Sequence, residues 1–211
     1  MQILPTDYRN AVISFSRGEF SEACVRLMNL VMIDWHPDIL IGIRTGGYLV
    51  AKSMTHAPEA PLHVLPITCR RPTTRLKMIS KTLRKLVSLL PRAILDRLRV
   101  IEHKFLTRGT PSRKIGNYEF DPAELAALEA WIARAGARPH ILIVDDSVDT
   151  GTTLALVFDA VRRRSPVTAV IKSAVITVTT REPVIKPDYT LLHQKLCRFP
   201  WSMDAQPSRA P

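Results

Sequence analysis

The chain has 211 residues, which is enough for one domain with a full hydrophobic core. Apolar residues make up 46% and charged residues 23%, as in an ordinary soluble globular protein, and no apolar run approaches the roughly 20 residues that a membrane-spanning helix needs. The first residues show no secretory signal, and the three cysteines are far apart without metal-ligand spacing. We therefore expect a reduced, cytoplasmic protein.

The net charge of +11 comes from one segment of the chain. Residues 70–118 contain 14 Lys and Arg against Asp96 and Glu102, a balance of +12, while all other residues together total −1. The basic character is therefore a local feature inside an otherwise near-neutral protein.

The first third of the chain shows alternating helix and strand patterns. Residues 7–33 have a helical apolar stripe with a break near Gly18. The short apolar run 39–43 is typical of a buried parallel strand, and a helix is predicted over 48–54. A second strand is predicted over 62–67.

The middle of the chain has a different, more basic composition. Residues 76–90 and 92–107 form two basic amphipathic segments that are separated by Pro91, which cannot continue a helix without a kink or break. Residues 108–118 have the composition of a loop.

The regular pattern resumes at Asp121, a good N-cap before Pro122. Strands that alternate with helices predict an α/β fold with a mainly parallel sheet. The expected elements are a helix over 122–135, a strand over 141–144, a loop over 145–153, a helix over 154–164, a strand over 167–178 and an irregular tail from 181.

A buried strand followed by carboxylates and a hydroxyl-rich turn occupies residues 141–153. The apolar strand is followed at once by Asp145 and Asp146, and residues 149–153 read Asp-Thr-Gly-Thr-Thr. Ligands of open parallel sheets bind at the carboxyl ends of the strands, where this turn would lie. Backbone N–H groups opening a helix favour a phosphate, and adjacent carboxylates suit a ribose diol or a magnesium ion. The combination predicts a sugar phosphate with a free diol.

Residues 141–153 resemble the thirteen-residue signature with which type I phosphoribosyltransferases bind phosphoribosyl pyrophosphate (PRPP). The resemblance implies an enzyme that uses Mg²⁺ and transfers ribose 5-phosphate from PRPP to a nitrogenous acceptor, with release of pyrophosphate. It also implies the twisted, mainly parallel sheet of that family. Taken alone, the segment could also be a receiver-like or nucleotide-binding strand end that carries two Asp.

The resemblance assigns roles to the signature residues. Asp145 and Asp146 would bind the ribose hydroxyls, directly or through the metal. Asp149, Thr150, Gly151, Thr152 and Thr153 would hold the 5-phosphate. In the 6-oxopurine members an Asp at position 149 is proposed to accept a ring-nitrogen proton, which favours a purine-like acceptor here. The alternative is that Asp149 only caps the next helix.

A second segment, residues 42–48, resembles the pyrophosphate loop of the same family. Arg44, Thr45, Gly46 and Gly47 would bind pyrophosphate, and the bond between Arg44 and Thr45 is where the family often holds a non-proline cis peptide. The family's closing loop would begin near Cys69, and the cations expected there for pyrophosphate are Arg71, Arg75 and Lys77.

Three later residues are candidates for contact with the acceptor. Lys172 lies near the position of a lysine that the purine enzymes place against an exocyclic oxygen, and Tyr189 or Trp201 could stack on a base. Lys172 could instead be a solvated strand-edge lysine, and Trp201 could be an anchor in the core.

The resemblance divides the chain into a core of residues 1–69 and 115–180, a basic loop and helical insertion over 70–114, and a C-terminal hood over 181–211. The insertion could be a cap or an oligomer contact, a nucleic-acid surface or an anionic membrane surface, and we favour the first, in a homo-oligomer. Besides the transferase, a PRPP-sensing regulator that binds nucleic acid through this segment remains a second hypothesis, and reverse-type phosphorolysis or hydrolysis a third.

Overall fold

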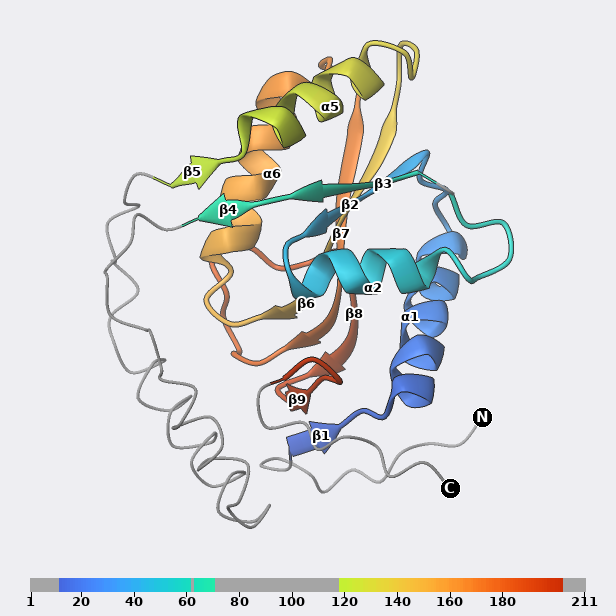
Figure 1. Cartoon of the computed structure of the whole chain (residues 1–211), viewed down its shortest axis with the longest axis vertical. Helices are drawn as coiled ribbons and strands as arrows, with labels where there is room; N and C mark the ends of the chain where they lie inside the picture. The colour runs from blue at the N-terminus through green and yellow to red at the C-terminus, as the bar shows by residue number, and fades with distance from the viewer. Residues whose placement is uncertain (1–11, 62, 71–117, 203–211) are drawn as a thin grey trace.

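The computed structural model describes residues 12–61, 63–70 and 118–202, and in these a parallel five-stranded sheet lies between two layers of helices (Figure 1). The strand order is β3-β2-β6-β7-β8, and every neighbouring pair in this sheet is parallel. This confirms the predicted α/β class. The strands are β2 (Ile39–Ile43), β3 (Val64–Ile67), β6 (His140–Val148), β7 (Val170–Val178) and β8 (Tyr189–His193).

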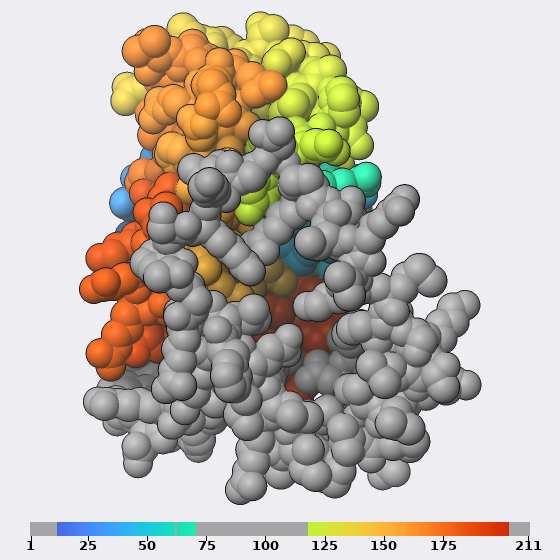
Figure 2. Space-filling model, turned by 90° about the vertical axis from the view of Figure 1, so that its left-hand side faces the viewer, coloured from blue at the N-terminus to red at the C-terminus, as the bar shows by residue number. Residues whose placement is uncertain are grey.

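Helices cover both faces of this sheet because its central strands are apolar on both sides. In β6, Leu142 and Val144 pack with helices α1 (Arg17–Met32) and α2 (Gly46–Met54). The alternate residues Ile141 and Ile143 pack with α5 (Pro122–Ile132) and α6 (Thr152–Arg164). Figure 2 shows α5 and α6 side by side on one face, where Arg164 of α6 and Glu129 of α5 form a 3.0 Å ion pair.

The first helix begins later than the apolar stripe indicated. Ser16 caps it in a capping box with Glu19, and Gly18 lies in its first turn without breaking it. The prediction of helix from residue 7 was therefore wrong for Val12–Ser14, which form strand β1.

The carboxyl-terminal tail is also more regular than predicted. Residues 189–193 form β8 at the edge of the central sheet, and β9 (Leu196–Arg198) pairs in parallel with β1. The prediction of irregular structure was wrong here because backbone hydrogen bonds from neighbouring strands compensate for a weak apolar pattern. After β9, the rings of Phe199 and Trp201 stack with their centroids 5.0 Å apart.

Two short strands mark the ends of the basic segment. β4 (Cys69–Arg70) and β5 (Glu119–Phe120) pair in antiparallel fashion, so the residues just before and just after the basic segment lie next to each other. The predicted amphipathic segments 76–90 and 92–107 lie outside the described residues. Among the residues that are described, no helix has the length and apolar character needed to cross a bilayer.

Candidate active site

The polar residues of the signature lie where the strands of the sheet end. β6 continues through the acidic pair to Val148, and its partner in β7 for Asp145 is Val175. The prediction of a loop from 145 was therefore wrong for residues 145–148, because pairing with β7 keeps this stretch extended. The true loop is the short turn between Val148 and α6.

The two glycines that open α2 pack directly against the acidic pair. A Cβ atom on Gly46 would lie 2.0 Å from Oδ2 of Asp146, and one on Gly47 would lie 2.4 Å from the carbonyl oxygen of Val144. Only residues without a side chain permit this approach. Two segments about 100 residues apart in sequence therefore form one site.

The loop before these glycines has the backbone that the family resemblance implied. The peptide bond between Arg44 and Thr45 is cis. The Nε atom of Arg44 lies 3.0 Å from Oε1 of Glu124, whose carboxylate also accepts hydrogen bonds from the backbone N–H and the hydroxyl of Thr68. Glu124, on α5, thereby joins the two connections that follow β2 and β3. Half of the Arg44 side chain stays exposed, so its remaining N–H groups can reach a ligand.

Burial and mutual repulsion disfavour the ionised forms of the acidic pair. The pKa of Asp145 lies well above its ordinary value, first because the carboxyl is withdrawn from water and then because Asp146 carries a like charge. The pKa of Asp146 is also raised by burial, although hydrogen bonds from the backbone and side chain oppose this. The backbone N–H of Ser147 donates one of these bonds, 2.9 Å long, to Oδ1 of Asp146.

This donor set fits a magnesium ion. Mg²⁺ prefers oxygen ligands and is usually held by one or two carboxylates together with substrate oxygens. A divalent cation would also offset the charge that burial and repulsion penalise at Asp145 and Asp146. In the described part of the chain, no group of three or more His, Cys, Asp or Glu side chains could hold a metal ion, so the acidic pair would need substrate oxygens to complete such a site.

The turn before α6 forms an anion-binding arrangement. Gly151 is the N-cap residue with a φ of 80° and has no side chain to cap the helix, although the backbone N–H of Thr152 donates a long 3.4 Å hydrogen bond to the Thr150 hydroxyl. The hydroxyl oxygens of Thr150 and Thr152 lie 3.0 Å apart at the surface. The uncapped N–H groups and these hydroxyls can bind a phosphate at the positive end of the helix dipole.

Asp149 lies two residues before Gly151, which is the N-cap residue of α6. The Asp149 side chain accepts a hydrogen bond from the hydroxyl of Thr179, the residue that follows β7. Asp149 is exposed at the same end of the sheet as the phosphate turn, so a bound ligand could reach its carboxylate.

The structure does not bring Lys172 and Tyr189 to Asp149. Lys172 pairs with Leu142, three positions before the level of Asp145 and therefore about 10 Å back along the strand. Its Nζ donates a 2.8 Å hydrogen bond to the Tyr189 hydroxyl, which donates to Asp34 at the end of α1. These contacts link α1 to the sheet.

Trp201 packs against other aromatic rings. Its ring stacks on Phe199 and meets the edge of Phe20 with the centroids 4.8 Å apart. These contacts agree with the alternative of a core anchor. The predicted pyrophosphate ligands Arg71, Arg75 and Lys77 lie outside the described residues.

Two contributors to this site were missed from the sequence, Glu124 and Thr179. Both carried a usable signal. Glu124 lies in the first turn of a helix with an unambiguous start, and Thr179 follows the apolar run of β7, where polar residues meet the carboxyl edge of the sheet.

Comparison with known proteins places this arrangement in a family. The family model described as a phosphoribosyl transferase domain matches residues 21–206. No curated protein matches the chain.

Two solved structures show the same fold over nearly the whole chain. A purine phosphoribosyltransferase from Pyrococcus horikoshii is 18% identical with a TM-score of 0.55, and the match covers 94% of this chain and 97% of that one. A xanthine-guanine-hypoxanthine phosphoribosyltransferase from Helicobacter pylori is 15% identical with a TM-score of 0.52, covering 92% and 95% respectively. With the family model matching most of its length, this chain belongs to the phosphoribosyltransferase family.

Proposed function

We propose that this protein transfers ribose 5-phosphate from PRPP to a purine-like nitrogenous acceptor and releases pyrophosphate. The observation that carries the proposal is the packing of Gly46 and Gly47 against Asp145 and Asp146, beside the uncapped start of α6. A pyrophosphate loop, a diol- or metal-binding carboxylate pair and a phosphate turn then lie on one edge of the sheet. These are the three groups that PRPP presents.

Each part of PRPP has a binding element. The turn from Asp149 to Thr153 would hold the 5-phosphate through backbone N–H groups and hydroxyls. The loop at Arg44–Gly47 would hold the pyrophosphate, with the Arg44 guanidinium kept in position by Glu124. Asp145 and Asp146 would bind the ribose hydroxyls directly or through Mg²⁺, which when bound neutralises charge on the leaving group.

The reaction breaks one bond at the ribose C1 atom and forms another. The bond from C1 to the pyrophosphate oxygen breaks, its electron pair leaves with pyrophosphate, and an acceptor nitrogen forms the new bond to C1. That nitrogen then loses a proton, for which the exposed carboxylate of Asp149 is the acceptor that we propose. Its hydrogen bond from Thr179 would orient it for this role, and general-base help of this kind gives about 10²–10⁴-fold.

A purine-like acceptor is supported by Asp149 and by the fold. Both structures reported above are named as purine-type enzymes, which supports the proposal at the level of fold. Lys172, Tyr189 and Trp201 stay predictions as acceptor contacts: in the structure the first two contact each other and Asp34, and Trp201 packs on Phe20 and Phe199.

The test is magnesium-dependent release of pyrophosphate from PRPP in the presence of separate purine and pyrimidine bases. The wild-type protein should release pyrophosphate with purine-like bases, and the double variant Asp145→Asn, Asp146→Asn should not. The matched control is Asp159→Asn, which removes an exposed carboxylate on α6 that pairs only with Arg163 among the described residues. Equal rates for the double variant and the control would reject the assignment, and PRPP binding without turnover would favour the sensor hypothesis.

A further inference from the structure

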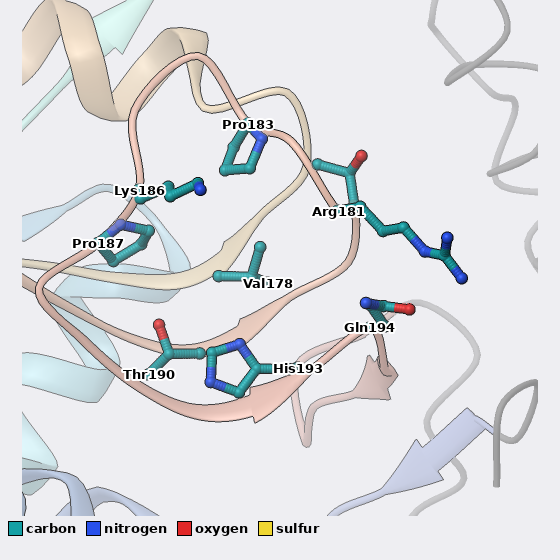
Figure 3. A pocket seen from close by; sticks show the side chains of 9 residues that line it. Val178, Arg181, Pro183, Lys186, Pro187, Thr190, His193 and Gln194 are labelled. Atoms are coloured by element: carbon teal, nitrogen blue, oxygen red, sulfur yellow. The ribbon is translucent and has the colours of Figure 1, made fainter.

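A separate pocket of about 290 Å³ lies at the end of β7, between β8 and the connection that joins the two strands (Figure 3). Its walls come from the end of β7, from β8 and from the connection between these strands. The lining residues are Val178, Thr180, Arg181, Pro183, Lys186, Pro187, Thr190, His193 and Gln194.

This pocket is distinct from the place where Asp149 lies. Val178 and Thr180 line the pocket, but Thr179 between them is directed to Asp149, to which its hydroxyl donates a hydrogen bond. The residues of the candidate active site are also absent from the pocket lining. A ligand in the pocket would therefore be a second ligand.

The charge of the lining selects the kind of ligand. The titratable side chains of the lining are Arg181, Lys186 and His193, and no carboxylate is among them. Within the described part of the chain none of the three forms an ion pair. In Figure 3 the Lys186 side chain extends into the cavity between Pro183 and Val178, whereas the Arg181 side chain starts at the edge of the cavity and its guanidinium points outward. The positive charges of Lys186 and Arg181 beside a concave site favour an anion.

The neutral residues of the lining add to this selection. The hydroxyls of Thr180 and Thr190 and the amide of Gln194 can hydrogen-bond to phosphate oxygens. Val178 and the rings of Pro183 and Pro187 provide an apolar wall, and the volume leaves room beside a phosphate for a small organic group.

One wall of the pocket is fixed to the phosphate turn of the candidate active site. The backbone N–H of Val184 donates a 2.8 Å hydrogen bond to the carbonyl of Thr150. Ile185 and Pro183 pack so closely on Gly151 that an added Cβ there would meet them at 3.1–3.2 Å. The wall is therefore held before any ligand arrives, which lowers the cost of ordering it.

From these observations we infer that the pocket is a second phosphate site, which binds free phosphate or a small phosphate ester through Lys186 inside the cavity, with Arg181 adding positive charge at its edge. A ligand there contacts the same segment that supports Thr150 and Gly151, so its binding is linked to binding at the phosphate turn. That linkage rests on the proposed function, whereas the existence of the site does not.

The experiment is a residue-resolved NMR titration of the isotope-labelled full chain with inorganic phosphate and, separately, with ribose 5-phosphate. Saturable shifts are expected for backbone amides within 180–186 and 190–194, separate from those of 150–153. Saturation with both probes at similar concentrations identifies the phosphate group as the recognised feature, and saturation with ribose 5-phosphate alone identifies an ester. Either result supports the site.

A paired variant tests the assigned cations. Arg181→Gln with Lys186→Gln should weaken binding in the pocket by roughly tenfold or more, because a charge-assisted contact and a positive charge at the edge are lost. The control Arg134→Gln with Arg138→Gln removes the same charge from exposed positions after α5. Absence of saturable shifts in 180–186 and 190–194 with either probe, or equal weakening in both double variants, would overturn the inference. A chain that fills this pocket but releases no pyrophosphate would contradict the proposed function alone.

Discussion

The Nε atom of Arg44 lies 3.0 Å from Oε1 of Glu124. A residue of α5, on one face of the sheet, therefore holds the loop that leads from β2 to α2 on the other face. The pair connects the cation expected at the pyrophosphate to α5, and Thr68 donates to the same carboxylate. We therefore regard Glu124 as a positioning residue for Arg44.

Glu124→Gln should raise the KM for PRPP by about tenfold, because the amide keeps the hydrogen bond from Thr68 but loses the charge that orients Arg44. The measurement is steady-state pyrophosphate release over a range of PRPP concentrations. Glu129→Gln on the same helix is the control, since it breaks only a surface pair with Arg164. If both variants show the same KM, Glu124 has no positioning role.

Gly47→Ala should destabilise the fold and abolish activity. The added methyl group would meet the backbone of Val144 and Asp145 at 2.4 Å and 2.7 Å, and neither backbone atom can move without breaking β6. Overpacking of this kind costs about 1–3 kcal/mol, measurable by urea unfolding. Gly18→Ala is the opposite case, because nothing lies within 4 Å and alanine favours α1. If Gly47→Ala and the wild type have the same midpoint urea concentration for unfolding, the close packing of Gly47 against β6 does not contribute to stability.

Asp145→Asn should make the metal-free protein more stable while it abolishes turnover. A carboxyl whose pKa is raised in the folded state contributes most stability below its unfolded pKa and loses it as the pH rises through the folded pKa. At pH 7 in EDTA, where the carboxyl of the unfolded chain is ionised, the raised folded-state pKa of Asp145 therefore opposes folding, and the amide removes this cost. Thermal unfolding should show a melting temperature a few degrees above that of wild type, with a smaller difference near pH 4. A lower melting temperature at pH 7 would show that the buried charge is already compensated.

Thr179→Val should lower kcat by about tenfold and leave the KM for PRPP nearly unchanged. The substitution removes the hydrogen bond that orients Asp149 but none of the groups assigned to PRPP. Thr179→Ser, which retains the hydroxyl, should restore most of the rate. The role assigned to Asp149 is contradicted if valine and serine give equal rates.

Lys172→Met should reduce stability without changing the KM for the acceptor. The pKa of Lys172 is raised chiefly by its hydrogen bond with Tyr189, so its stabilising effect is complete below the unfolded pKa and is lost as the pH rises through the folded pKa. Urea unfolding from pH 8 to pH 11 should therefore show a smaller alkaline loss in the variant. The comparison is Lys52→Met, which lies over Tyr48 at the surface. A change in acceptor KM would support a contact between Lys172 and the acceptor.

The sequence predicted the central elements because their signals are local. Residues 39–43 are four apolar residues and a glycine between turn signals, and all five are buried in β2. Asp121 followed by Pro122 fixed the start of α5, where the Asp121 side chain accepts from Ala123 and Glu124 backbone N–H groups. The elements that the sequence did not predict depend on pairing with other strands. β1 and β9 form because they pair with each other, and neither has a strand pattern of its own in the sequence.

The sequence predicted the two motifs of the candidate site, residues 42–48 and 141–153, but not the contacts that bring them together. The cis bond at Arg44–Thr45 lies where the family resemblance placed it. The ion pair of Arg44 with Glu124 joins residues 80 positions apart, which no spacing rule reaches. Lys172 lies near the start of the nine-residue β7, opposite Leu142, whereas Val175 further along the strand lies opposite Asp145, and the sequence did not indicate this spacing.

The pairing of β2 with β6 determines when the protein can first bind its ligand. Ile39 lies opposite Ile141, so a growing chain makes β2 about 100 residues before β6 exists. Contacts this distant in sequence form late, after a large loss of chain entropy. Until then the glycines of α2 have no carboxylates beside them, and an unfinished polypeptide cannot capture a sugar phosphate. Retention on a phosphate-bearing resin would therefore report completed folding of newly made chains.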